Sequence, residues 1–160
     1  MTAALLALAM LEQPECHVRG RALRQLATAC RAAEVAHQLP AGILCSVALA
    51  ETGGRWKVRR EKGGSCSVGI FQIYLPGCPS AAVRILRGSS TSTHADAAAW
   101  LLRLRWRPKS RFPWAAYNPG SKRWRVRVGA IWGRIRTVAK NARVESPTTR
   151  IFRVVAKPDA

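Results

Sequence analysis

A strongly apolar helix predicted over Ile43 to Glu51 constrains the fold more than any other segment. A Leu-Pro-Ala-Gly turn at residues 39–42 precedes it, and Thr52-Gly53-Gly54 follows it. Glycine readily adopts the left-handed backbone conformation of a helix C-terminal cap, so the helix is predicted to end there. Its apolar side chains belong in a core, which the rest of the chain must supply.

Helical spacing of apolar residues recurs on both sides of this segment. Further helices are predicted over Thr2–Leu11, Arg21–Gln38, Ala81–Arg87, Asp96–Arg105 and Lys122–Arg143. In the last of these, Trp124, Val128, Ile131 and Ile135 form one apolar stripe. Two segments do not fit a helix: residues 55–65 are basic and are expected to form a loop, and residues 67–75 are short and apolar.

The length of 160 residues suits one domain. We expect a mainly α fold, with a single domain of five or more helices over residues 20–143, an N-terminal segment at 1–19 and a tail at 144–160. The apolar run near the N-terminus is too short to span a bilayer. A signal peptide has basic residues before its apolar run, whereas here no Lys or Arg precedes Arg19. It is therefore a short helix packed on the domain or a leader remnant. We expect no transmembrane segment and leave the export route open.

The chain is strongly basic, with 27 Lys and Arg against 8 Asp and Glu and a formal net charge of +19. The basic residues are spread from Arg19 to Lys157 rather than gathered in a tail, so the folded surface is expected to be cationic. Such a surface attracts polyanions such as nucleic acid, anionic membranes or cell-wall polymers. The excess of arginine over lysine also fits a GC-rich coding sequence without any functional meaning.

The five cysteines and three histidines show no metal-ligand spacing, so we expect no metal and no cofactor. An odd number of cysteines leaves at least one free thiol. Cys66 and Cys78 are spaced so that they can pair in an oxidising compartment. We favour the simpler expectation that all five are small buried hydrophobic side chains.

Among the eight acidic residues, Glu51 is the best candidate for catalysis. On a helix it shares one face with Leu44, Val47 and Ala48, so its carboxyl points toward the core. Burial and the negative end of the helix dipole both disfavour the carboxylate and raise its pKa, as a general acid requires. The alternative is a glutamate at a frayed helix end that faces solvent or pairs with Arg55.

Three sequence motifs, in order, resemble those of the soluble lytic transglycosylases, which have a goose-type lysozyme-like fold. The first is the apolar helix that ends in Glu51-Thr52-Gly53-Gly54. The second is Ser67-Val68-Gly69-Ile70-Phe71-Gln72-Ile73, and the third is Ala116-Tyr117-Asn118-Pro119-Gly120 before a helix. The resemblance covers about 90 residues with their flanking helices.

This resemblance implies cleavage of the β-1,4 bond between N-acetylmuramic acid and N-acetylglucosamine, with 1,6-anhydromuramoyl ends as products. Glu51 then protonates the leaving oxygen and afterwards accepts the proton of the sugar 6-hydroxyl, while the substrate acetamido group assists. Only one carboxylate is needed, whereas most glycosidases use two. The sequence is compatible with a mechanism that uses one carboxylate, since no Asp or Glu lies between Glu61 and Asp96.

The resemblance also implies substrate-binding residues, namely Ser67, Gly69, Phe71, Gln72, Tyr117 and Asn118. Gly69 allows close approach of the backbone to the glycan, and Phe71 is part wall and part core. The Gln72 amide can bind the sugar or satisfy loop backbone, and the Tyr117 hydroxyl can bind Glu51 or the sugar. Ser67 is assigned to the acetamido group, and Asn118 is expected mainly to hold its turn.

The implied partners are peptidoglycan strands and anionic wall polymers, bound by a monomer without specific nucleic-acid recognition. The implied location is the cell envelope, periplasmic or extracellular, or else a phage particle. Two alternatives stay open. One is a goose-type lysozyme-like hydrolase on the same fold, and the other is a basic nucleic-acid binding protein that stacks bases on its tryptophans. Those tryptophans are Trp100, Trp106, Trp114, Trp124 and Trp132.

Overall fold

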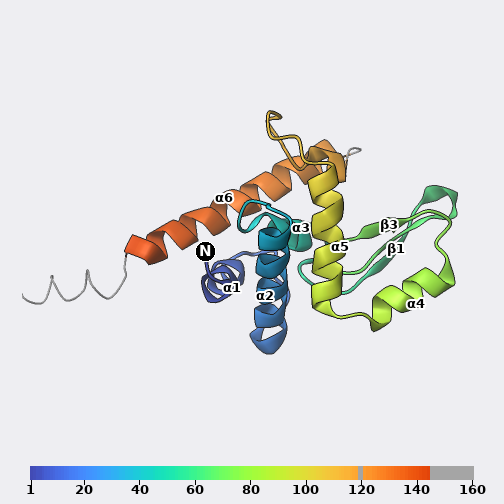
Figure 1. Ribbon diagram of the computed structural model, residues 1–160, viewed down its shortest axis with the longest axis horizontal. Coiled ribbons are helices and arrows are strands. Elements are labelled where there is room, and N and C mark those ends of the chain that lie inside the picture. Colours follow the sequence, from blue (N-terminus) through green and yellow to red (C-terminus); the bar gives the residue numbers. More distant parts are fainter. Residues whose placement is uncertain (119–120, 145–160) are drawn as a thin grey trace, which may run out of the picture.

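The computed structural model describes residues 1–118 and 121–144, and they form a mainly helical domain with a small sheet (Figure 1). The helices are α1 (Ala3–Leu11), α2 (Gly20–Ala36), α3 (Ile43–Thr52), α4 (Ser80–Gly88), α5 (Thr91–Leu104) and α6 (Lys122–Val144). Short 3-10 turns lie at η1 (Lys62–Gly64) and η2 (Ala115–Tyr117). The expected mainly α class is confirmed. Of the tail predicted over residues 144–160, Val144 is the last residue of α6, and residues 145–160 lie outside the described residues.

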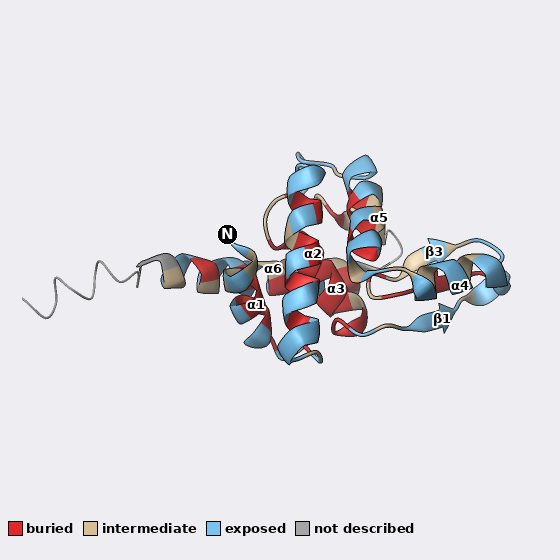
Figure 2. Ribbon diagram, turned by 60° about the horizontal axis from the view of Figure 1, so that its bottom comes forward, coloured by how far each residue is buried: buried red, intermediate tan, exposed pale blue. Residues whose placement is uncertain are grey.

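Helix α3 forms the centre of the core. Of its ten residues, all except Glu51 are buried, and Figure 2 shows the helix in red between α2 and α5. It packs against α6 and α2, with a smaller contact to α5. The apolar stripe predicted on α6 is confirmed, because Val128, Ile131 and Ile135 are fully buried. A short helix this apolar is stable only when neighbours cover it on all sides.

Helix α1 belongs to the same core. Leu6, Ala9 and Met10 are fully buried where α1 packs against α2 and α6. The Arg134 guanidinium on α6 reaches back to both carboxylate oxygens of Glu15 at 2.8 Å. None of the helices in the described part of the chain is long and apolar enough to cross a membrane.

The stretch predicted as a loop at residues 55–65 contains a strand, which corrects that expectation. Strand β1 (Val58–Arg60) pairs with β2 (Cys66–Val68), and β2 pairs with β3 (Ile73–Leu75), both antiparallel. The signal for β1 was weak because its three residues are all exposed and two are arginines, so no apolar alternation marks it.

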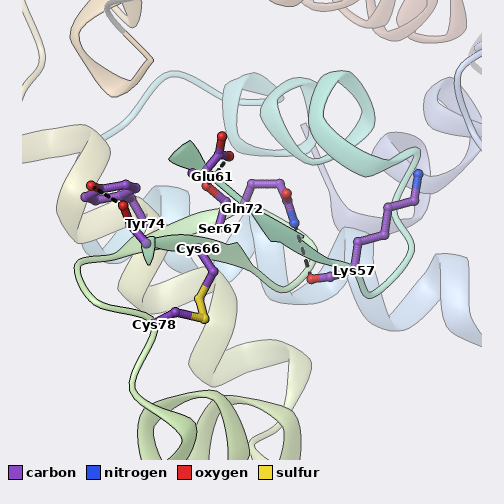
Figure 3. Close-up of a disulfide and its surroundings, with 8 residues drawn as sticks. Lys57, Glu61, Cys66, Ser67, Gln72, Tyr74 and Cys78 are labelled. Carbon is purple, nitrogen blue, oxygen red and sulfur yellow. Dashed lines mark hydrogen bonds between the residues drawn. A yellow bond between two sulfur atoms is a disulfide. The ribbon is translucent and has the colours of Figure 1, made fainter. Parts of the chain in front are cut away.

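The expectation that all five cysteines are free thiols is wrong for two of them. Cys66 on β2 and Cys78 before α4 form a disulfide with a Cα–Cα distance of 5.0 Å (Figure 3). The bond ties the sheet to the segment that leads into α4, a helix with no buried residue of its own. Cys16, Cys30 and Cys45 are free and buried, as expected.

Helix α5 begins at Thr91, earlier than the predicted start at Asp96. Ser90 is the N-cap, and its hydroxyl accepts the backbone N–H of Thr93 at 3.1 Å. A serine before a run of helix-compatible residues is a regular start signal, so residues 91–95 belong to the helix and its predicted start was five residues late.

Candidate active site

The end of α3 opens into a cleft of about 1090 Å³ between the sheet and the start of α6. Five of the seven residues that the motifs singled out line it: Glu51, Ser67, Gln72, Tyr117 and Asn118. They come from three separate parts of the chain, namely α3, the β2–β3 hairpin and η2 with the residue after it. The fold therefore brings most of the candidate residues to one concave surface, the usual setting of a ligand site.

The Glu51 carboxyl is half-buried at the floor of this cleft, in the last turn of α3. Burial raises its pKa from 4.5 to about 7, and the side chains of Asn118 and Trp124 act against that rise. The alternative pairing with Arg55 is not made, because the Arg55 Nε donates to the carbonyl of His17 instead. A carboxyl with a pKa near 7 can both give and take a proton at neutral pH.

Backbone geometry fixes where Glu51 lies. Gly53 caps α3 with a φ of 67°, in the left-handed region. A side chain there would also collide with the ring of His17, whose nearest carbon is 2.0 Å from the Cβ position. The Thr52 hydroxyl donates to the Ile70 carbonyl at 2.8 Å, so the end of α3 is tied to the β2–β3 turn. Glu51 is thus held next to the hairpin residues.

One face of the sheet forms a wall of the cleft. Arg59, Ser67 and Tyr74 are direct cross-strand partners, so their side chains lie on the same face, and all three line the cleft. Cys66, one residue before Ser67, points to the opposite face and its disulfide. Figure 3 shows Ser67 and the disulfide on opposite sides of the sheet.

Glu61 is a cleft residue that the sequence analysis did not assign. The Ser67 hydroxyl donates to the Glu61 carboxylate at 3.1 Å (Figure 3). The Arg59 Nε lies 3.6 Å from the same oxygen. A second carboxylate therefore lines the same cleft as Glu51. The missed signal was the hairpin itself, because recognising β1 would have placed Glu61 at its end, facing β2.

The Gln72 side chain satisfies loop backbone, which is one of the two roles expected for it. Its amide nitrogen donates to the carbonyls of Gly69 at 2.9 Å and Lys57 at 3.3 Å, which stabilises a turn where Gln72 itself has a φ of 52°. These bonds use the donor, and the amide oxygen stays available as an acceptor in the cleft. Its contact with Lys57 is drawn in Figure 3.

Tyr117 lines the cleft, but its hydroxyl donates to the Phe71 carbonyl at 2.9 Å rather than to Glu51. Its ring stacks on Trp124 with a centroid distance of 6.0 Å and an interplanar angle of 13°. Burial raises the pKa of the Tyr117 hydroxyl above its ordinary value, and the negative charge of the nearby Glu51 raises it further. Tyr117 is therefore a neutral phenol that positions the cleft wall.

Gly69 and Phe71 do not line the cleft, which corrects the roles that the motif suggested. Phe71 is fully buried in the core. Gly69 has a φ of 85° and is packed so that a Cβ would lie 3.2 Å from the Trp56 ring and 3.4 Å from His94. The glycine is needed for packing behind the sheet, and Phe71 serves the cleft through its carbonyl, which accepts from Tyr117.

Trp124, at the start of α6, contributes a second feature that was not expected. Its side chain is buried and lines the cleft, and its indole nitrogen has no hydrogen-bond partner within the part of the chain that the structure describes. The indole N–H faces the Glu51 carboxyl closely enough to lower its pKa, without forming a well-aligned hydrogen bond. Buried donors without a partner are uncommon and call for an explanation.

Within residues 1–118 and 121–144, no three His, Cys, Asp or Glu side chains are grouped so that they could hold a metal ion. The comparisons with known proteins add no assignment: no family model matches the sequence, and neither a curated protein nor a solved structure does. The case for function therefore rests on the cleft and on the motifs that line it.

Proposed function

We propose that this protein is a peptidoglycan lytic transglycosylase with a lysozyme-like fold and Glu51 as its acid and base. The observation that carries the proposal is the setting of Glu51, half-buried at the floor of a cleft with a pKa near 7. The lining of this cleft by residues of all three motifs supports it further. The order of elements, an apolar helix ending in glutamate, a β-hairpin and later a long helix, fits the same family.

In the proposed reaction, protonated Glu51 first donates to the glycosidic oxygen as the bond to the muramoyl anomeric carbon breaks. The substrate acetamido group assists at that carbon. The resulting carboxylate then accepts the proton of the muramoyl 6-hydroxyl as this oxygen attacks the anomeric carbon and closes the anhydro ring. Asn118 and Trp124, which favour the charged form of Glu51, stabilise it between the two steps.

A goose-type lysozyme-like hydrolase is the second candidate, and Glu61 is the observation that favours it. A hydrolase that inverts the anomeric carbon needs a second carboxylate to activate water on the far side of the sugar. Glu61 lines the cleft and is oriented by Ser67. We rank this candidate second because Arg59 and Ser67 already engage the Glu61 carboxylate.

A nucleic-acid binding protein is less well supported. Trp114 and Trp124 are buried, and Trp106 and Trp132 pack against the core. Of the five tryptophans interleaved with arginine, Trp100 alone is exposed, at 54%. A single ring does not make the row of stacking platforms that base recognition uses.

Product analysis on purified peptidoglycan tests the proposal. The wild type should release fragments with 1,6-anhydromuramoyl ends, which mass spectrometry distinguishes from reducing ends by the loss of one water. Glu51→Gln provides the blank. Reducing ends from an active wild type would instead support the hydrolase, and Glu61→Gln should then abolish turnover. This substrate would place the protein in the cell envelope or in a phage particle. We propose that it acts there as a monomer.

A further inference from the structure

The cleft around Glu51 is lined by an unusual number of cations. Five basic side chains face it: Arg59, Lys62, Arg105, Arg123 and Arg127. Two carboxylates, Glu51 and Glu61, share the same walls. The positive charge is therefore concentrated at the site itself and is not only a property of the whole surface.

Most of these cations have no counter-ion within the part of the chain that the structure describes. Arg59 lies 3.6 Å from Glu61. The side chains of Lys62, Arg105, Arg123 and Arg127 make no ion pair or hydrogen bond with any residue of the described part of the chain, and all four are exposed. Outside the cleft, Arg31 and Arg134 pair with Glu34 and Glu15, whereas exposed arginines such as Arg24, Arg84 and Arg87 make no ion pair within the described residues, so the cleft is distinguished by the gathering of its cations rather than by their lack of partners. Unpaired cations gathered in one cleft are suited to an anionic ligand.

Their placement puts the charge beside the reacting bond. Arg59 on β1 and Arg127 on α6 both act on the Glu51 carboxyl from opposite walls, and Arg105 at the end of α5 acts on Tyr117. A glycan lying over Glu51 would pass between these cations. Neutral sugars offer guanidinium groups only hydroxyl and amide oxygens, whereas carboxylates or phosphates attached to the sugars form charge-assisted hydrogen bonds with them.

We propose that the cations of this cleft select glycan strands that carry anionic substituents, through Arg105, Arg123 and Arg127 on one wall and Arg59 and Lys62 on the other. The inference rests on the proposed function and goes beyond it. It makes the arginines specificity determinants rather than a general attraction to the cell wall. The anionic groups are stem-peptide carboxylates or the phosphates of attached wall polymers, which share the same chemistry toward arginine.

The test compares two triple variants with the same loss of charge. The cleft variant carries Arg105→Gln, Arg123→Gln and Arg127→Gln. The matched control carries Arg24→Gln, Arg84→Gln and Arg87→Gln, at exposed positions on α2 and α4 outside the cleft. Both are assayed for kcat and KM on soluble peptidoglycan strands. Circular dichroism and Tm verify that both variants fold.

Three substrate forms identify the anion. One retains its wall polymers, one has lost them by hydrofluoric acid treatment, and one has its carboxyls also capped as methylamides. We expect the cleft variant to lose about tenfold or more in kcat/KM on the uncapped strands, mainly through KM, and the control to lose about twofold or less. Capping should lower the wild-type value similarly and leave the cleft variant unchanged. If acid treatment alone causes that loss, phosphate is the anion recognised.

Equal losses in the two triple variants, or a wild type indifferent to both treatments, would overturn the inference while leaving the proposed function intact. A cleft variant that loses affinity for single-stranded DNA but retains its kinetics on the strands would also overturn it, in favour of nucleic acid. Binding of the three strand forms to Glu51→Gln provides a readout that does not need turnover. If Glu51→Gln binds the strands in an anion-dependent way but the wild type does not cleave them, the proposed function is wrong and the anion preference stands.

Discussion

Two glutamates with similarly perturbed acidity lie at opposite ends of α3. Glu34 belongs to α2, but its side chain lies at the N-terminus of α3, whereas Glu51 is in the last turn of α3. Burial raises the pKa of each carboxyl to about 7. Glu34 is fully buried, and its two oxygens accept the backbone N–H groups of Gly42 and Leu44, both at 2.9 Å. Glu51 instead opens to a cleft and faces only side chains.

The difference shows that a raised pKa does not by itself identify a catalytic acid. Glu34 satisfies two backbone donors that the helix start leaves without intrahelical partners, so its carboxyl is fully used and closed to any substrate. Glu51 has room in front of it and neighbours that adjust its charge. Access to the cleft and unused hydrogen-bonding capacity, rather than a raised pKa, separate the functional glutamate from the structural one.

The largest expected effect is loss of activity in Glu51→Gln. Removing the proton donor should lower kcat by at least about 10³-fold, because one group serves both proton transfers. The unfolding free energy at neutral pH should stay the same or rise, since a partly buried charge is removed. Strand cleavage and chemical denaturation measure the two effects. Retained cleavage would show that another residue is the acid.

Glu34→Ala should show the opposite pattern, with a loss of stability and little loss of activity per folded molecule. The change leaves the N–H groups of Gly42 and Leu44 buried without an acceptor, which costs about 3 kcal/mol or more. Denaturation at a pH of about 5, where the carboxyl is neutral in the folded chain, measures this effect. Glu12→Ala is the exposed control and should change stability by less than about 0.5 kcal/mol.

The pH dependence of stability should reveal both glutamates together. Each binds its proton more tightly in the folded chain, with a pKa of about 7 against 4.5 in the unfolded chain. The unfolded state therefore loses these protons first, and stability falls as the pH rises from about 4.5 to about 7. Below that window both states are protonated, and above it the two groups add no further change.

Replacing both residues by glutamine tests this sign. The slope of the unfolding free energy against pH should flatten between about 4.5 and 7 in the double variant, and each single variant should remove part of it. A slope that persists in the double variant would assign the pH dependence to other groups. Stability that rises through the window in the wild type would contradict the raised pKa values directly.

The smallest expected effect separates the surroundings of the two acids. Trp124→Phe keeps an aromatic ring and removes the N–H that favours charged Glu51. The pKa of Glu51 should rise, and the alkaline limb of the kcat/KM profile should move up by about half a pH unit. Trp132→Phe is the control, because its indole N–H donates to the Ala41 carbonyl at 3.1 Å, away from the cleft. Identical profiles for wild type and Trp124→Phe would remove Trp124 from the site.

Local pattern was enough to predict most helices and the position of Glu51. The bounds of α3 and α6 follow from apolar spacing and from the glycines after Thr52, because these signals act within a few residues of the chain. The strand β1 escaped prediction because Val58-Arg59-Arg60 has no apolar alternation. Its pairing with β2 is a contact between segments, which no local pattern encodes.

The sequence by itself determined a basic, mainly α chain with a glutamate at the end of a strongly apolar helix. Tertiary structure alone decided what surrounds that glutamate. It turned Phe71 into the core, brought Glu61 to Ser67, and set Trp124 around the cleft together with four cations that make no ion pair within the described residues. The physical reason is that periodicity reports which face of an element is buried, whereas the neighbours of a side chain depend on packing between elements distant in the chain.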